Sequence, residues 1–158
     1  MKYFAYGSNM DVGQMEERGV VFSSVSPAIL NDYALVFNKQ SRKYPAIGFA
    51  NIVPKDGSIV EGALYELQDK DLLKLDRFEG YPVHYLRDQV KVLSGDQMVR
   101  AHVYVGSPGM LREGLVPSRQ YLDHLLVGRA FMSDGYLLSL QQVPVLDLQE
   151  GTIRRKER

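Results

Sequence analysis

The sequence predicts a single α+β domain built from several strands and a few helices. Residues 20–60 are rich in β-branched and aromatic side chains and are broken by turn signals, which is typical of consecutive strands. Residues 69–79 instead gather three leucines on one side of a helix, and a segment that begins at Pro117 spaces its apolar residues three and four positions apart, as amphipathic helices do. The chain has 158 residues, and a chain of this size buries about 70% of its unfolded surface. No linker or internal repeat indicates a second domain.

The N-terminal half is expected to combine strands with one short helix. Residues 2–6 are aromatic and apolar and predict a strand, which ends abruptly at Gly7-Ser8-Asn9. Residues 10–18 predict a short helix for which Asn9 supplies the N-cap. Further strands are expected at residues 33–38, 46–53 and 58–67, separated by turn signals that include Asn31-Asp32 and Lys55-Asp56-Gly57.

The C-terminal half begins with the most regular helical segment. In residues 69–79, Leu72, Leu73 and Leu75 are expected on one side, and Gly80 follows where a left-handed residue is favoured. Residues 85–93 and 99–105 predict a hairpin. Pro117-Ser118 opens a second strong helix, and a short helix is expected at residues 135–141. We assign residues 1–148 to the domain and residues 149–158, which are mostly charged, to a solvated tail.

The composition argues against several classes of function. The 19 Lys and Arg residues balance the 19 Asp and Glu residues, whereas a nucleic-acid binder needs a basic surplus. Cys is absent, and the three His residues, at positions 84, 102 and 124, lack zinc-ligand spacing, so no metal site is expected. Motifs for dinucleotides and phosphate loops are missing. No apolar run approaches the ~20 residues of a membrane span, and the N-terminus does not look like a signal peptide, so we expect a cytoplasmic protein.

The junction between the first strand and the first helix is a candidate binding site. Gly7, Ser8 and Asn9 form a small-residue turn at a helix N-terminus, where backbone N–H groups lack intrahelical partners. These groups and the positive end of the helix dipole favour a bound carboxylate or phosphate. The alternative is a turn and an N-cap with no ligand, since turn chemistry explains all three residues.

Glu79 is the candidate acid or base. It lies two turns after Leu72, within ~20° of the same helix face, so its carboxylate is expected to point toward the core. It also ends the helix, where the dipole disfavours negative charge. Desolvation and the helix end would raise its proton affinity, which suits proton transfer near neutral pH. The alternative is a structural ion pair with Arg77 or Arg87.

Several ordered motifs resemble the γ-glutamylcyclotransferase family. They span residues 3–141 and comprise Tyr3-Phe4-Ala5-Tyr6-Gly7-Ser8-Asn9, Gly62-Ala63-Leu64-Tyr65-Glu66-Leu67, Leu75-Asp76, Glu79-Gly80, the strand at residues 85–92, and Pro117-Ser118 with Tyr121. The Tyr-Gly-Ser-Asn motif and the late Pro-Ser-x-x-Tyr motif look like the branch that acts on γ-glutamyl amino acids.

The resemblance implies both a fold and a reaction. Family members fold as a compact α+β domain around a mixed, partly barrel-like sheet with a few flanking helices. They use no cofactor and convert a γ-glutamyl amino acid to 5-oxoproline and a free amino acid. Glu79 matches the catalytic glutamate of the family. The residues that match the substrate pocket are Tyr3, Phe4, Ala5, Tyr6, Gly7, Ser8, Asn9, Tyr85 and Tyr121.

The expected partner is therefore a small γ-glutamyl substrate, with no nucleic acid and no membrane. Two alternatives stay open from the sequence. The protein could be a non-catalytic module that binds a small carboxylate at Gly7-Ser8, or a cyclotransferase for another γ-glutamyl amide. The sequence leaves open whether the protein is a monomer or a homodimer and which leaving group it prefers.

Overall fold

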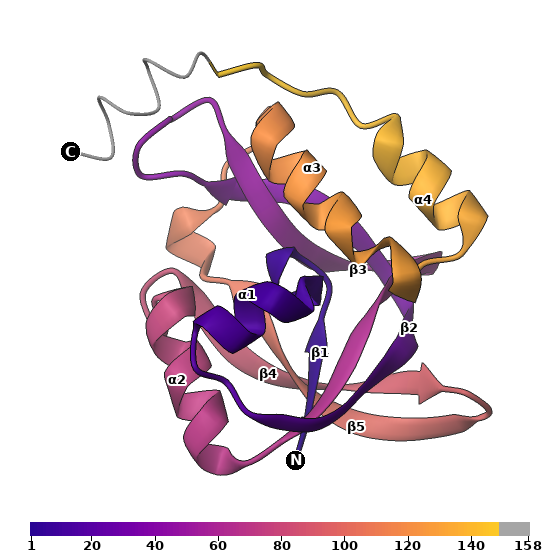
Figure 1. Ribbon diagram of the computed structural model, residues 1–158. Helices are drawn as coiled ribbons and strands as arrows, with labels where there is room; N and C mark the ends of the chain where they lie inside the picture. The colour runs from indigo at the N-terminus through magenta and orange to yellow at the C-terminus, as the bar shows by residue number, and fades with distance from the viewer. Residues whose placement is uncertain (149–158) are drawn as a thin grey trace.

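Strands form the framework of the protein and close on themselves into a barrel (Figure 1). The computed structural model describes residues 1–148. Within them the barrel has five strands, in the order β1-β3-β2-β4-β5. Their bounds are β1 (Lys2–Ala5), β2 (Phe22–Gln40), β3 (Gly48–Leu67), β4 (Tyr85–Ser94) and β5 (Gln97–Gly106). Neighbouring strands run antiparallel, except that β5 closes the barrel by pairing parallel to β1, with His102 opposite Tyr3. The predicted α+β domain with a mixed, barrel-like sheet is confirmed.

The region from residue 20 to residue 67 differs from its prediction. It forms two long strands, β2 and β3, instead of several short ones. The two expected turns, at Asn31-Asp32 and at residues 55–57, lie opposite each other and interrupt the register without reversing the chain. Asp32 and Gly57 both have positive φ, 61° and 81°, and the Gly57 N–H donates to Asp32 Oδ1 at 2.9 Å. The turn residues therefore build an irregularity within one continuous ribbon.

The first helical segment is also divided differently from its prediction. A 3-10 turn, η1 (Ser8–Met10), precedes α1 (Val12–Glu17). The N-cap of α1 is Asp11, whose Oδ1 accepts from the Gln14 N–H at 3.3 Å. The prediction that Asn9 caps this helix is wrong, because its side chain turns inward and is 3% exposed. The Asn9 side chain is therefore available for hydrogen bonds inside the protein.

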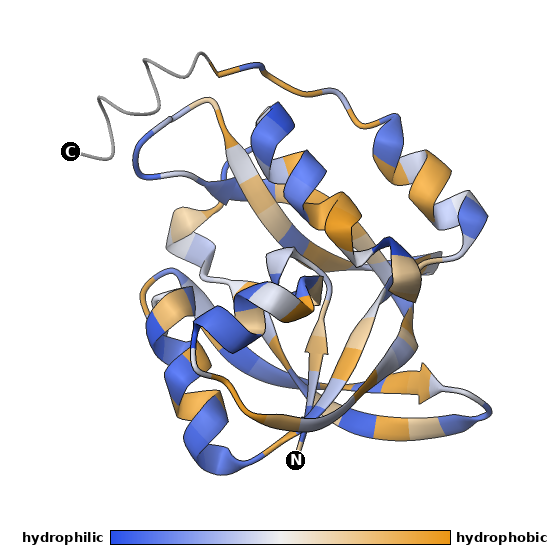
Figure 2. Ribbon diagram, viewed as in Figure 1, coloured by the Kyte–Doolittle hydropathy of each residue, from blue (hydrophilic) through white to orange (hydrophobic). Residues whose placement is uncertain are grey.

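Helix α2 (Asp69–Glu79) has the predicted bounds. The prediction that Leu73 shares a side with Leu72 and Leu75 is wrong, because it lies about 100° around the helix from Leu72 and is exposed. The helix packs Leu72 and Leu75 into the core and ends at Gly80, which adopts the left-handed conformation with φ 65°. Burial of a leucine side chain contributes about 1.5–3 kcal/mol, so these two leucines anchor the helix. Figure 2 shows hydrophobic and hydrophilic segments alternating along it. The anchored helix lies beside the barrel (Figure 1), and Glu79 is its last residue.

The C-terminal helices lie side by side over the β2–β3 ribbon (Figure 1). Ser118 and Ser133 cap them, each accepting from the backbone N–H three residues later. The remaining elements are η2 (Pro108–Met110), α3 (Arg119–Leu126), η3 (Val127–Phe131) and α4 (Asp134–Gln141). The predicted tail, residues 149–158, lies outside the described residues. Of the helices in residues 1–148, none has the length and apolar content needed to cross a membrane.

Candidate active site

Glu79 and Asn9 meet at the end of α2. Glu79 is half-buried, and its Oε1 accepts a hydrogen bond from Asn9 Nδ2 at 2.9 Å. Gly80, the next residue, bends the chain away in a left-handed conformation. The carboxylate therefore stays beside the loop that follows β1. Helical spacing predicts that it points toward the core side, and its partner Asn9 is buried.

The orientation of the Asn9 amide is fixed by its other partners. Its Oδ1 accepts from Gln14 Nε2 at 3.1 Å and from Arg18 Nη1 at 2.9 Å. Its Nδ2 also approaches Tyr3 Oη at 3.0 Å. Because two donors occupy the oxygen, the NH₂ group must face Glu79. This network holds one oxygen of Glu79 and leaves the other available to a ligand.

Burial raises the pKa of Glu79 to about 7. Desolvation is the main cause, and it is opposed by the charge of Arg18, the Asn9 hydrogen bond and the charge of Lys39. The pKa values of Tyr3 and Tyr6 are raised, first by their own burial and then by Glu79, so both hydroxyls stay protonated. Glu79 is therefore poised to take up and return a proton near neutral pH.

A small niche of about 40 Å³ lies against this carboxylate. It is lined by Tyr3, Tyr6, Gly7, Ser8, Asn9, Ala50, Glu79, Tyr85, Tyr104 and Tyr121. The structure thus gathers eight of the ten predicted site residues around one cavity. Phe4 and Ala5 are not among them, because they lie in the core, 0% and 1% exposed. Ala50 and Tyr104 also line the niche, and no sequence motif indicated them.

Two tyrosines bracket Ala50 on the wall of the niche. Tyr121 Oη accepts from the Ala50 N–H at 3.1 Å, and Tyr85 Oη donates to the Ala50 carbonyl at 2.9 Å. A Cβ on Gly7 would lie 3.4 Å from Tyr121 Oη, so glycine keeps this side of the niche open. The N–H groups of Gly7 and Ser8 stand at the start of η1, where they have no intrahelical partner. They are available to an anionic oxygen.

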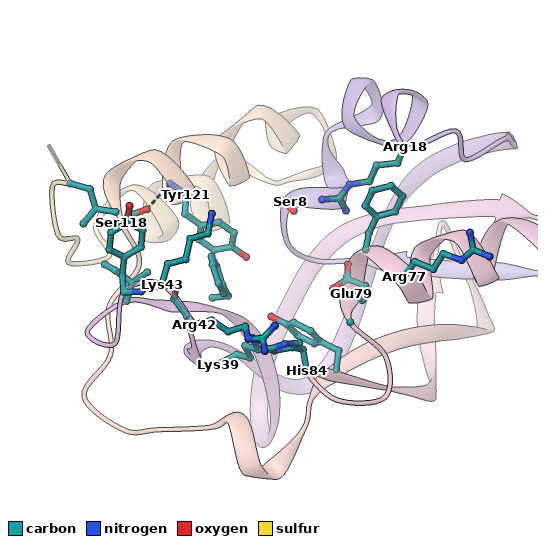
Figure 3. Close-up of a pocket in the computed structure, with 18 residues that line it drawn as sticks. Ser8, Arg18, Lys39, Arg42, Lys43, Arg77, Glu79, His84, Ser118 and Tyr121 are labelled. Carbon is teal, nitrogen blue, oxygen red and sulfur yellow. Dashed lines mark hydrogen bonds between the residues drawn. The ribbon is translucent and has the colours of Figure 1, made fainter. Parts of the chain in front are cut away.

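A larger cleft of about 660 Å³ adjoins the niche (Figure 3). Ser8, Glu79, Tyr85 and Tyr121 line both cavities, so Glu79 stands where one opens into the other. The cleft also contains basic side chains that the sequence analysis did not select, namely Arg18, Lys39, Arg42, Lys43 and His84. Their positions depend on how β2, α1 and the segment after α2 are brought together.

The sequence left open that Glu79 forms a structural ion pair with Arg77 or Arg87. Within residues 1–148, no cationic nitrogen lies within 4 Å of the Glu79 carboxylate. Arg87 instead pairs with Asp76, with Nε 3.3 Å from Oδ1, and stacks on the Tyr81 ring. The same residues contain no cluster of three His, Cys, Asp or Glu side chains that could hold a metal ion.

The mixed barrel matches the fold of the class of protein that the motifs resembled. Sequence comparison identifies the family, because a family model described as "Gamma-glutamyl cyclotransferase, AIG2-like" matches residues 3–124. The chain therefore belongs to this family, and its membership supports an enzymatic activity of the cyclotransferase type. Among curated proteins, sequence comparison finds no match.

Solved structures share the fold. A gamma-glutamyl cyclotransferase is 23% identical, with a TM-score of 0.80 over 99% of this chain and 98% of that one. An uncharacterized protein from Homo sapiens is 24% identical, with a TM-score of 0.79 and the same coverage. A yeast gamma-glutamyl cyclotransferase specific to glutathione is 14% identical, with a TM-score of 0.61 over 99% and 96% of the chains. At these identities the likeness shows the fold alone.

Proposed function

We propose that the protein cyclises a γ-glutamyl amino acid to 5-oxoproline and releases the free amino acid. The observation that carries this proposal is the position of Glu79, hydrogen-bonded to Asn9 at the mouth of the niche and with a pKa of about 7. A carboxyl group tuned to this range can accept a proton from a substrate ammonium and later donate it. Membership of the cyclotransferase family supports the same reaction.

The reaction needs one proton carrier from the protein and no second reactant besides the substrate. Glu79 takes a proton from the α-ammonium of the glutamyl residue, and the freed amine attacks the γ-carbonyl carbon. A carbon–nitrogen bond forms within the five-membered ring, and the amide bond to the second amino acid breaks. Glu79 then returns this proton to the leaving nitrogen. By the same route it carries the second hydrogen of the ring nitrogen to the released amine, so the products are the neutral lactam and an ammonium ion. Because nucleophile and electrophile belong to one molecule, the protein contributes mainly by holding the substrate folded.

The loop after β1 supplies the electrostatic part of this mechanism. As the amine attacks, negative charge develops on the γ-carbonyl oxygen, and N–H donors aimed at that oxygen stabilise the transition state. The Gly7 and Ser8 N–H groups are suited to this role, because they stand at the start of η1 beside Glu79. The neutral hydroxyls of Tyr85 and Tyr121 would limit the space around the folded substrate.

The test is turnover by Glu79→Gln. Purified wild type is incubated with γ-glutamyl amino acids and γ-glutamylamines, and 5-oxoproline is followed by mass spectrometry. We expect product from the wild type and a loss of about 100- to 10,000-fold in Glu79→Gln, the range typical of a general base. Glu113→Gln is the matched control, because Glu113 is exposed and lines neither cavity.

Binding of 5-oxoproline separates catalysis from binding. The product should raise the melting temperature of both the wild type and Glu79→Gln if the variant keeps its site. Turnover retained in Glu79→Gln would reject the role of Glu79. Absence of product from every substrate, with 5-oxoproline still bound, would favour the binding module instead.

A further inference from the structure

The outer cleft concentrates positive charge. The chain as a whole is neutral, but five Lys or Arg side chains line this cavity, against a single carboxylate, that of Glu79. Figure 3 shows Lys39, Arg42 and His84 grouped on one wall, with Arg18 across the cavity beyond Glu79. Positive side chains around a concave surface focus the field and attract anions.

Four of these cations have no ion-pair partner among the residues that the structure describes. Within residues 1–148, no ion pair joins Arg18, Lys39, Arg42 or Arg77 to a carboxylate. Elsewhere in the described residues some basic side chains are paired with carboxylates, namely Lys2, Lys74, Arg87 and Arg119. Gathering uncompensated like charges costs stability, so their presence in one cleft points to a ligand that supplies the missing negative charge.

Lys39 is the most buried of these cations. It is 4% exposed, near the end of β2, and its Nζ donates to His84 Nδ1 at 2.8 Å. The same Nζ lies 5.7 Å from the ring centres of Phe49 and Tyr85. A buried ammonium group is costly unless it has partners, and His84 supplies one of the three that it can bind. Lys39 lines the cleft, so a ligand bound there could accept from the remaining donors.

The placement of the substrate assigns this cleft to the leaving group. Glu79 must reach the α-ammonium, so the amino-acid end of the glutamyl residue lies toward the niche. The niche has only about 40 Å³, whereas the cleft on the other side of Glu79 has about 660 Å³. The group released by cyclisation therefore projects into the basic cleft.

We propose that the outer cleft selects a leaving group with two or more carboxylates, namely an acidic amino acid or a short acidic peptide. This inference rests on the cyclotransferase activity proposed above. A leaving amino acid with a neutral side chain brings only one carboxylate to the cleft. Cations on opposite walls, Arg18 on one side and Lys39 with Arg42 on the other, are better matched by carboxylates that are several bonds apart.

The test compares three substrates that differ mainly in the charge of the leaving group: γ-glutamyl-glutamate, γ-glutamyl-glutamine and γ-glutamylbutylamine. We expect wild type to prefer γ-glutamyl-glutamate over γ-glutamyl-glutamine by about tenfold in kcat/KM, the effect of one charge-assisted hydrogen bond. The preference should shrink as salt is added, because salt screens the charges of the cleft.

Arg42→Gln is the first variant, since Arg42 is exposed and its replacement does not disturb the core. It should lower kcat/KM for γ-glutamyl-glutamate about tenfold more than for γ-glutamylbutylamine. Lys39→Met, which keeps the length of the buried side chain, should have the same selective effect. Arg100→Gln and Lys91→Met are the matched controls, exposed on the β4–β5 hairpin and outside both cavities.

Equal losses on all three substrates would overturn this inference, because they would assign the cations to the glutamyl carboxylate that every substrate carries. Turnover by wild type without a preference for γ-glutamyl-glutamate would overturn it too, while leaving the proposed reaction intact. Absence of product from all three substrates would overturn the proposed function and this inference with it.

Discussion

The Asn9 amide and the Glu79 carboxylate lie 70 positions apart in the sequence and meet with Nδ2 2.9 Å from Oε1. The contact joins the loop after β1 to the last residue of α2. Because Gln14 and Arg18 hold the other end of the amide, the charge state of Glu79 is linked to α1 as well. The proton affinity of Glu79 therefore depends on three elements: the loop after β1, α1 and α2.

The pH dependence of wild-type turnover follows from the pKa of Glu79. Cyclisation needs Glu79 ionised, so kcat/KM should fall on the acid side with an apparent pKa of about 7. The measurement is kcat/KM from pH 5 to pH 9 with a γ-glutamyl amino acid. An acid limb near the ordinary glutamate value of 4.5 would contradict the desolvated site.

Arg18→Met should move that acid limb to higher pH. The charge of Arg18 is the largest influence that lowers the pKa of Glu79, so its removal lets desolvation raise the pKa further. At pH 6 the variant should lose much more kcat/KM than at pH 8.5, where Glu79 is ionised in both proteins. Arg129→Met, at an exposed site in η3, is the control and should keep the wild-type profile. An acid limb that moves to lower pH would contradict the conclusion that the charge of Arg18 lowers the pKa of Glu79.

Glu79→Gln should stabilise the fold at high pH and not at low pH. In the folded protein the pKa of Glu79 is about 7, above its ordinary value of 4.5. Above pH 7 the charged carboxylate therefore destabilises the folded state relative to the unfolded state. This penalty disappears as the pH falls from 7 through 4.5, because Glu79 is then protonated in both states. Thermal unfolding at pH 8 should show the variant a few degrees above wild type, since ~1 kcal/mol shifts Tm by ~2–4 °C in a domain of this size.

The melting curves of the two proteins should converge at pH 4. A variant less stable than wild type at pH 8 would indicate that Glu79 forms a stabilising contact when charged, as a structural ion pair would. The same proteins therefore test the alternative in which Glu79 is structural, without any substrate.

Local sequence predicts the parts of this site that depend on local structure. The bounds of α2, the left-handed Gly80 and the inward direction of Glu79 follow from helical spacing and one glycine. The turn at Gly7-Ser8 is equally local, because small residues end β1 there. These features needed no knowledge of the barrel.

The rest of the site depends on contacts between distant segments. Lys39 and His84 are 45 positions apart and become neighbours only because β2 and the segment after α2 adjoin in the fold. Asn is a residue type favoured at N-caps, but the Asn9 side chain binds Glu79 across the site. The turns predicted at Asp32 and Gly57 do not reverse the chain for the same reason. The Gly57 N–H donates to the Asp32 side chain across the β2–β3 ribbon.

Gly80→Ala should destabilise the protein more than Gly95→Ala. Both glycines are left-handed, with φ of 65° and 63°, so each alanine carries the same backbone cost of ~1–2 kcal/mol. At Gly80 the new Cβ would also lie 2.7 Å from His84 Cδ2 and 3.1 Å from His84 Cβ, whereas at Gly95 nothing lies within 4 Å. Urea denaturation of both variants measures the difference. Because His84 holds Lys39, only Gly80→Ala should also lower kcat/KM, and equal effects of the two substitutions would show that His84 moves aside freely.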